Sequence, residues 1–237
     1  MPTETSPDST VLRVQQVLEQ AILEGRYGPG DRIRENAVAA ELNVSRAPVR
    51  EACRMLERVG LVRILPNQGT VVASLTLNEV VQLFDIRTAL GRLAGERAAA
   101  SISDESLRIL RKLIADMDIA AADRDSHRYI GLNLDFHACL YEATGNKRLA
   151  EYDSAIGKEL RSYRRVGLAH GGGLAVSNQE HRTILACIER GACEEAGMHL
   201  AQHISNGRDR FLRAMSAEGL LIVDQRGLAQ GPEKALS

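Results

Sequence analysis

Side chains in the second half of the chain could together bind a metal ion. Asn133 and His137 lie four residues apart, so they share one face of a helix. His181 and His203 follow on two later helical segments, and ligands from three helices are a usual way to build a metal site inside a bundle. Imidazoles with one side-chain oxygen suit zinc, nickel, iron or manganese. Packed or exposed histidines without a metal are common, so this pattern alone leaves a metal-free interpretation open.

The same residues raise the alternative of a hydrolytic metal centre. A catalytic site keeps one coordination position open, and three imidazoles with one amide would leave such a position. Glu180 is the glutamate nearest in sequence to these histidines, and on a helix it points about 100° away from His181. Because this pair does not form a recognised catalytic motif, we expect the protein not to be an enzyme.

A stripe of arginines near residue 50 is a candidate surface for DNA. Arg46, Arg50 and Arg54 recur every four residues, and Ser45 with the first-turn amides can face a phosphate. Residues 44–63 hold five Arg and two Glu, although the formal net charge of the chain is -1. Apolar residues form the opposite face: Val49, Ala52, Met55 and Leu56. Such a helix fits the major groove, and a solvated helix face is the alternative.

The segments around this stripe predict three helices followed by a hairpin. Helices are expected at 10–24, 35–42 and 45–59, and strands at 61–65 and 70–74 around a turn at 66–69. Ser45 is a suitable N-cap for the third helix, and Gly60 is suitable for its left-handed end. This order is typical of a winged helix-turn-helix, which we place at residues 9–74 after a flexible tail at 1–8.

Beyond Ser74 the apolar periodicity is helical throughout. Aromatic residues make up 3% of the chain and Trp is absent, so the cores must be aliphatic, which favours packed helices. Helices are expected at 77–101, 104–122, 124–144, 147–168, 175–190 and 192–216. The predicted fold class is therefore mainly α: the winged helix-turn-helix and then an all-helical bundle at 77–216, with a tail at 217–237.

The sequence also predicts a cytoplasmic protein without a membrane partner. Residues 1–8 lack the basic start and apolar run of a signal peptide. No apolar stretch approaches the roughly 18 residues that a membrane helix needs. The four cysteines contain no CxxC pair, so we expect reduced, mostly buried thiols.

The first domain resembles the DNA-binding domain of the GntR family of bacterial transcription regulators. The resemblance rests on Pro29-Gly30-Asp31, Leu42-Asn43-Val44-Ser45-Arg46, Pro48-Val49-Arg50-Glu51, Leu56-Glu57 and Gly69-Thr70. It implies operator contacts from Ser45, Arg46, Ala47, Pro48 and Arg50. It also implies that Gly69 lets the wing approach the minor groove and that Arg34 contacts a phosphate. Asn43 replaces a glycine that is frequent in the family, and asparagine also tolerates a left-handed turn.

Residues 77–216 are similar to the all-helical FCD effector domain of the FadR-type branch of that family. The similar segments are Arg87-Thr88-Ala89-Leu90, Phe136-His137, Thr144-Gly145-Asn146, Glu180-His181-Arg182 and His203-Ile204. The resemblance implies a divalent metal, zinc or nickel, held by Asn133, His137, His181 and His203. The first ligand is more often Asp, so Asn133 removes a negative charge and should weaken metal affinity. His199 lies four residues before His203 and is a competing ligand, but the interval from His181 to His203 resembles the family.

The FCD resemblance also gives Arg87 a role. It implies that Arg87 faces the cavity of the domain and pairs with a carboxylate of the effector, which a planar guanidinium does well. An amphipathic arginine on the bundle surface is the alternative. Gly91 stands where the family often has Glu, which predicts a local change in the first helix of the bundle.

Together these features predict a homodimeric regulator that binds double-stranded operator DNA. Two recognition helices would meet successive major grooves of a pseudo-palindromic site. A small organic acid, bound in the metal-containing helical domain, would relieve repression. Two alternatives are a metal-free, ligand-responsive regulator and a metal-dependent hydrolase with a DNA-binding appendix.

Overall fold

The structure is a computed structural model that describes residues 7–169, 172–217, 222–223 and 229–230. The chain folds as two compact units, Met1–Leu75 and Thr76–Ser237. Most of the expected tails at 1–8 and 217–237 lies outside the described residues. In the second of these segments, β4 (Ile222–Val223) pairs antiparallel with β5 (Ala229–Gln230).

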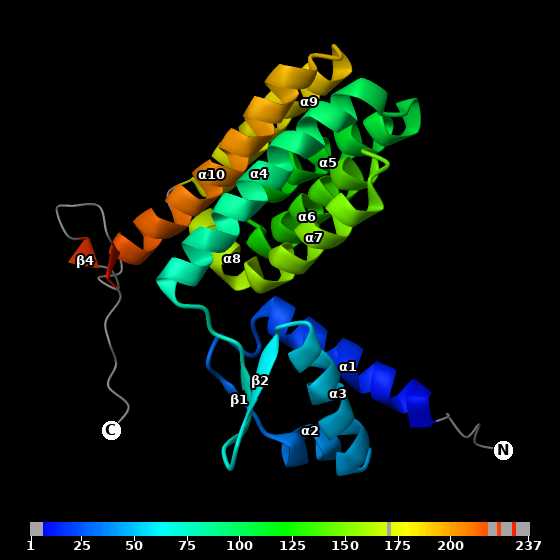
Figure 1. Cartoon of the computed structure of the whole chain (residues 1–237), viewed down its shortest axis with the longest axis vertical. Helices are drawn as coiled ribbons and strands as arrows, with labels where there is room; N and C mark the ends of the chain where they lie inside the picture. The colour runs from blue at the N-terminus through cyan, green and yellow to red at the C-terminus, as the bar shows by residue number, and fades with distance from the viewer. Residues whose placement is uncertain (1–6, 170–171, 218–221, 224–228, 231–237) are drawn as a thin grey trace. The chain divides into compact units, whose positions relative to one another are not determined.

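The first unit combines three helices with a small antiparallel sheet (Figure 1). Strand β3 lies between β1 and β2 and pairs with both. The expected order of helices and hairpin is confirmed, whereas β1 is a two-residue strand that the sequence did not predict. The elements are α1 (Pro7–Glu24), β1 (Arg32–Ile33), α2 (Glu35–Glu41), α3 (Arg46–Arg58), β2 (Val62–Leu65) and β3 (Gly69–Val72).

An aliphatic core fixes the direction of helix α3. One face of α3 is buried against α1, α2 and the sheet, and its buried residues are Val49, Ala52, Cys53 and Leu56. Burial of this apolar face is the main force that holds α3 in place. Arg46, Arg50 and Arg54 are exposed on the other side, as the four-residue spacing predicted.

Two left-handed residues shape the ends of α2 and α3. Asn43, just after α2, has φ 51°, and Gly60, just after α3, has φ 75°. Asparagine tolerates this conformation better than most residues, so the replacement of glycine at position 43 keeps the turn. Gly60 is the expected helix end.

The second unit is a helical bundle in which α4 and α10 run side by side (Figure 1). Helix α10 also packs on α8 and α9, while α5 packs on α6 and α9. No helix of the described residues is long and apolar enough to cross a membrane. The helices are α4 (Leu77–Ser101), α5 (Asp104–Ala122), α6 (Ser126–Glu142), α7 (Lys147–Glu159), α8 (Arg161–Ala169), α9 (Gly173–Glu189) and α10 (Cys193–Ala217).

Glycines allow the backbones of α4 and α10 to approach closely. A Cβ added to Gly95 would lie 2.7 Å from the carbonyl carbon of Ala196, so a larger residue would push the helices apart. At Gly91 a Cβ would overlap with the side chain of Ile204. A larger residue at position 91 would require the end of the Ile204 side chain to shift, so the local feature at Gly91 is close packing of α4 on α10.

One expected helix is wrong. The sequence predicted a continuous helix over 147–168, but the chain bends at Leu160, between α7 and α8. Leu160 has φ -81° and ψ -4°, and its side chain is fully buried. The apolar spacing continues through this position, so periodicity alone could not locate the bend. Because of the bend, α8 can line a cavity in the bundle with Arg164, Gly167 and Leu168.

Candidate functional site

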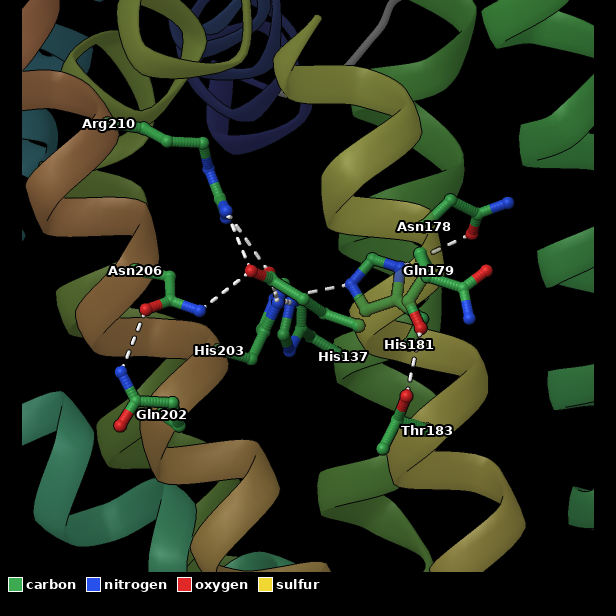
Figure 2. A network of polar contacts seen from close by, with 10 residues as sticks. His137, Asn178, Gln179, His181, Thr183, Gln202, His203, Asn206 and Arg210 are labelled. Carbon is green, nitrogen blue, oxygen red and sulfur yellow. Dashed lines mark hydrogen bonds and ion pairs between the residues drawn. The ribbon is translucent and has the colours of Figure 1, made fainter.

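Three histidines from three helices meet inside the bundle. His137 of α6, His181 of α9 and His203 of α10 are buried, and each can offer a ligand atom within 4.8 Å of the others. The Nε2 atom of His203 lies 3.2 Å from Nε2 of His181 and 3.2 Å from Nε2 of His137. Figure 2 shows the three rings converging between the helices. The same set was expected as ligands from the sequence.

Hydrogen bonds from the Nδ1 atoms of His203 and His181 orient these two rings and leave their Nε2 atoms unprotonated. Nδ1 of His203 donates a hydrogen bond to Oε2 of Glu180 at 2.7 Å, because a carboxylate can only accept. Nδ1 of His181 lies 3.4 Å from Oδ1 of Asn178. The Asn178 amide donates to the Ile114 carbonyl at 3.0 Å and to Asp118 at 2.7 Å, so its oxygen faces His181. The Nε2 atoms of His181 and His203 are therefore left as acceptors that face each other.

Burial keeps these imidazoles neutral. It lowers the pKa of His137 and His181 well below the ordinary value, and the cationic Arg164 lowers both pKa values further. Burial also lowers the pKa of His203, although the Glu180 carboxylate opposes this shift. Since two acceptor nitrogens 3.2 Å apart repel each other, the arrangement favours a cation between them.

Asn133, the fourth expected ligand, lies one helical turn before His137 on α6. Its side chain is buried, and its Oδ1 has no hydrogen-bond partner among the described residues. Asn133 and His203 both line the same small cavity. His199, the competing ligand, is exposed on α10 and is not part of the cluster. A metal ion could satisfy an orphaned oxygen in a cavity that one of the three clustered imidazoles also lines.

The cavity beside the histidines is small and lined by arginines. It has a volume of about 20 Å³, which is room for one or two water molecules. Arg87 of α4, Arg164 of α8 and Arg210 of α10 contribute to its wall. Arg87 lines the cavity, as expected, but its Nε donates to Oδ1 of Asp153 at 2.7 Å and one terminal nitrogen donates to Oδ2 at 3.4 Å.

Glu180 connects the histidine cluster to the arginines. Arg210 donates to both of its carboxylate oxygens, at 3.0 and 3.1 Å, and Asn206 donates to Oε1 at 2.7 Å (Figure 2). Burial alone would raise the pKa of Glu180, but the hydrogen bonds from His203 and Arg210 outweigh it and lower this pKa to about 2. The carboxylate is therefore charged, and it orients the ring of His203 without being a candidate ligand itself.

The candidate DNA surface lies in the first unit, around the start of α3. Ser45 occupies the N-cap position, but its side chain makes no capping hydrogen bond, so the hydroxyl remains available for another acceptor or donor. Ala47 is exposed and Pro48 is partly buried in the first turn. Gly69, with φ 84°, begins the second strand of the wing. A surface groove is lined by Arg32, Arg34, Arg46, Arg50 and Gly69.

Arg50 is held at this surface by an acidic neighbour. Its Nε lies 3.6 Å from Oε2 of Glu35 in the first turn of α2, and the Thr70 hydroxyl donates to the other oxygen of Glu35 at 3.3 Å. The side chain of Arg50 is 55% exposed, so it can still reach a partner outside the protein. Arg46 and Arg34 also expose their side chains on this surface.

Sequence reasoning missed the residues that support the histidine cluster. Asn178 precedes His181 by three residues and so shares its face of α9, which could have pointed to it. Glu180 was set aside because it points away from His181, yet this direction takes its carboxylate to His203. Asp153 carried no signal, because its partner Arg87 lies 66 residues away on α4.

Comparison with known proteins agrees with this architecture. The model of the bacterial regulatory proteins of the gntR family matches residues 10–72, and the FCD domain model matches residues 82–206. The structure of McbR/YncC from E. coli has the same fold: the TM-score is 0.77 at 21% identity, and the match covers 86% of this chain and 98% of that chain.

Sequence relatives are transcription regulators as well. The uncharacterized HTH-type transcriptional regulator YdhC of Bacillus subtilis is 28% identical, over 84% of this chain and 90% of its own length. The gluconate operon transcriptional repressor of Bacillus licheniformis is 32% identical, over 54% of this chain and 53% of its own length. Because these proteins are regulators and not enzymes, the hydrolase alternative is set aside. The chain belongs to the GntR family of bacterial transcription regulators and carries a C-terminal FCD domain.

Proposed function

We propose that the protein is a repressor whose affinity for operator DNA is controlled by a small organic acid and a divalent metal ion in the FCD domain. The observation that carries the proposal is the convergence of three imidazole Nε2 atoms, with the orphaned oxygen of Asn133 on a residue that lines the same cavity as His203. The similarity to a gluconate operon repressor supports the negative sign of regulation. An organic acid can release DNA only if it binds more tightly to the conformation of the protein that has low affinity for DNA. Titrating candidate acids into a protein–operator complex tests this, and unchanged operator affinity with every acid would contradict it.

The residues present fit zinc or nickel held by Asn133, His137, His181 and His203. Two nitrogen ligands of one zinc ion, each about 2.0–2.1 Å from it, lie about 3.0–3.4 Å apart. The two Nε2–Nε2 distances of 3.2 Å are close to this value. When bound, the ion would supply a Lewis-acidic centre that a carboxylate can ligate. Asn178 and Glu180 would hold the rings in the orientation that this requires.

For the effector, Arg87 remains a candidate contact. It lines the cavity, and its two contacts with Asp153 use Nε and one terminal nitrogen. The cavity of about 20 Å³ is smaller than an organic acid needs, so we expect binding to displace the helix α8 that covers it. The effector would then bind more tightly to the conformation with α8 displaced than to the conformation described here. Control of DNA binding requires such a difference in affinity between two conformations.

We propose that the start of α3 reads the operator and that the wing and α2 contact its backbone. Ser45, Arg46, Ala47, Pro48 and Arg50 would approach the major groove, Arg34 a phosphate, and Gly69 the minor groove. The groove lined by arginines supports this assignment.

Replacing Arg46 with alanine is expected to weaken operator binding by about 1–3 kcal/mol, or roughly 5- to 150-fold. Arg46 is exposed in the first turn of α3 and has no ion pair among the described residues, so its loss should leave the fold intact. Fluorescence anisotropy on a duplex selected by the wild-type protein from a random library measures the change. Arg108→Ala, which removes an exposed arginine of α5, is the matched control. Equal affinity of Arg46→Ala and wild type would remove this residue from the interface.

The protein is expected to be a homodimer, because one recognition helix reads only half of a pseudo-palindromic site. Ile86 and Leu93 of α4, seven residues apart, are 51% and 39% exposed, and they offer an apolar surface to a second copy. Sedimentation equilibrium of the full chain should give about twice the chain mass of 25.9 kDa. A mass of one chain at micromolar concentration would contradict the dimer.

A further inference from the structure

The imidazole of His181 is the inner end of a chain of polar contacts that reaches the surface of the bundle. Its Nδ1 atom lies 3.4 Å from Oδ1 of Asn178, a buried residue one helical turn earlier on α9 (Figure 2). The Asn178 amide donates to Oδ1 of Asp118 on α5 at 2.7 Å, and Oδ2 of Asp118 accepts from Arg182 of α9. The side chains of Asp118 and Arg182 are 47% and 39% exposed. One amide thus links a charged pair at the surface to a ring inside the bundle.

The hydrogen bonds of Asn178 determine which end of its amide faces His181. The amide nitrogen has two donor hydrogens, and the Ile114 carbonyl at 3.0 Å and Asp118 accept them. The amide oxygen is therefore left to accept from Nδ1 of His181. Because hydrogen bonds in a chain polarise one another, the negative charge of Asp118 makes this oxygen a stronger acceptor.

The tautomer of His181 decides whether the histidine cluster is open to a metal ion. With the proton on Nδ1, the Nε2 atom is a free acceptor, 3.2 Å from Nε2 of His203. With the proton on Nε2, His181 would donate to His203 instead, and the two rings would be closed by a hydrogen bond. This second arrangement satisfies two buried nitrogens at once, so burial favours it. Keeping the cluster open requires a neighbour that holds the proton on Nδ1.

We propose that Asp118 is a positioning residue for His181. Acting through Asn178, its carboxylate holds the imidazole in the tautomer with the proton on Nδ1 and so keeps Nε2 free. Arg182 holds Asp118 in the position that this requires. The consequence for metal binding rests on the proposed function, whereas the tautomer can be measured without a metal.

The neighbouring ring of His203 shows why an amide is needed beside His181. His203 donates directly to the carboxylate of Glu180 at 2.7 Å. A carboxylate at position 178 would be buried, and it would face the Ile114 carbonyl oxygen to which Asn178 now donates. Two acceptors at that distance repel each other, and a buried charge without a partner is costly. With Asn178 in this place, the charge stays at the surface and still acts on His181.

NMR of the metal-free full chain with ¹⁵N-labelled histidine tests the proposal. The signals of His181 are assigned from the spectrum of His181→Gln. In the wild type we expect a protonated Nδ1 and an unprotonated Nε2 for this ring. Asp118→Ala should shift the Nε2 resonance toward that of a protonated nitrogen. Asp118→Asn, which keeps an oxygen acceptor without the charge, should give a shift between the two.

Zinc affinity, measured by competition with a chromogenic chelator, gives the consequence for the cluster. Asp118→Ala is expected to bind zinc about 10-fold more weakly, the low end of the usual loss for an outer partner, since Asn178 keeps its bond to Ile114. Asp116→Ala is the matched control, because it removes a carboxylate of the same helix that pairs with Lys112. It should change neither the tautomer nor the affinity.

A purely structural role of Asp118 would give a different result. Loss of its ion pair with Arg182 between α5 and α9 would then lower the free energy of unfolding in Asp118→Ala but leave the tautomer of His181 unchanged. Because this ion pair is partly exposed, its loss is expected to cost less than about 1 kcal/mol, so the variant should remain folded. A circular dichroism spectrum identical to that of the wild type checks this.

The possible outcomes distinguish this inference from the proposed function. A proton on Nε2 of His181 in the wild type, or a tautomer that Asp118→Ala leaves unchanged, would overturn the role of Asp118 and leave the metal site standing. Equal shifts in Asp118→Ala and Asp116→Ala would overturn it as well. Absence of zinc binding in the wild type would overturn the metal site, while a tautomer shift confined to the Asp118 variants would still support the role of Asp118.

Discussion

Replacing His203 with alanine is expected to remove the metal from the purified protein. His203 is the central ring of the cluster, because its Nε2 lies 3.2 Å from the Nε2 atoms of both His137 and His181. Without it, two imidazoles and one amide remain, too few for a stable zinc site of the usual four ligands. Elemental analysis of protein purified without a metal-affinity column should fall from about one metal per chain to near zero.

His199→Ala is the matched control for this experiment. His199 lies on the same helix, one turn before His203, but its side chain is exposed and outside the cluster. It should keep the full metal content. Equal metal content in the wild type and in both variants, whether full or zero, would contradict the assignment of His203 as a ligand.

A second variant tests whether the residue that orients His181 affects metal affinity. Asn178→Ala removes the amide that orients His181, without touching a proposed ligand. Loss of such outer partners usually costs about 10–100-fold in metal affinity. Competition with a chromogenic chelator should therefore place Asn178→Ala between the wild type and His203→Ala. An unchanged affinity would mean that packing alone orients His181.

Much of the architecture could be predicted because local sequence patterns carry it. The bounds of α4 and α5 were predicted to the residue, since their apolar spacing is regular and both begin after a side-chain N-cap. The winged helix-turn-helix could be predicted because its order of three helices and a hairpin is characteristic. A two-residue strand such as β1 has no periodicity, and it forms only because β3 offers a neighbouring edge.

The supporting polar contacts could not be predicted for a different physical reason. Helical periodicity shows which face a residue shares with its neighbours, but not which distant helix will lie against that face. Glu180 and His203 belong to different helices, and Arg87 and Asp153 are 66 residues apart. The bend at Leu160 decides where Arg164 lies, and this bend reflects packing of the whole bundle. The candidate ligands could be predicted from the sequence, whereas the charged residues around them could be identified only from the structure.

The buried pair of Arg87 and Asp153 leads to the largest expected effect on stability. Arg87 is 2% exposed and Asp153 is 6% exposed. Burial alone would lower the pKa of Arg87, but the charge and hydrogen bonds of Asp153 raise it above the ordinary value. Replacing Asp153 with alanine would leave a buried guanidinium without a carboxylate, next to the second cation Arg164.

The free energy of unfolding of Asp153→Ala is expected to fall by about 3–5 kcal/mol, because removal of one partner strands a buried charge. Guanidinium denaturation followed by tyrosine fluorescence suits this test: the chain has no Trp, and four of its five Tyr lie in the helical unit. Glu151→Ala is the control, since it breaks an exposed ion pair with Arg148 on the same helix and should cost less than about 1 kcal/mol. If both variants lost equally little, Arg87 would not depend on Asp153 and would be free to bind an effector carboxylate directly.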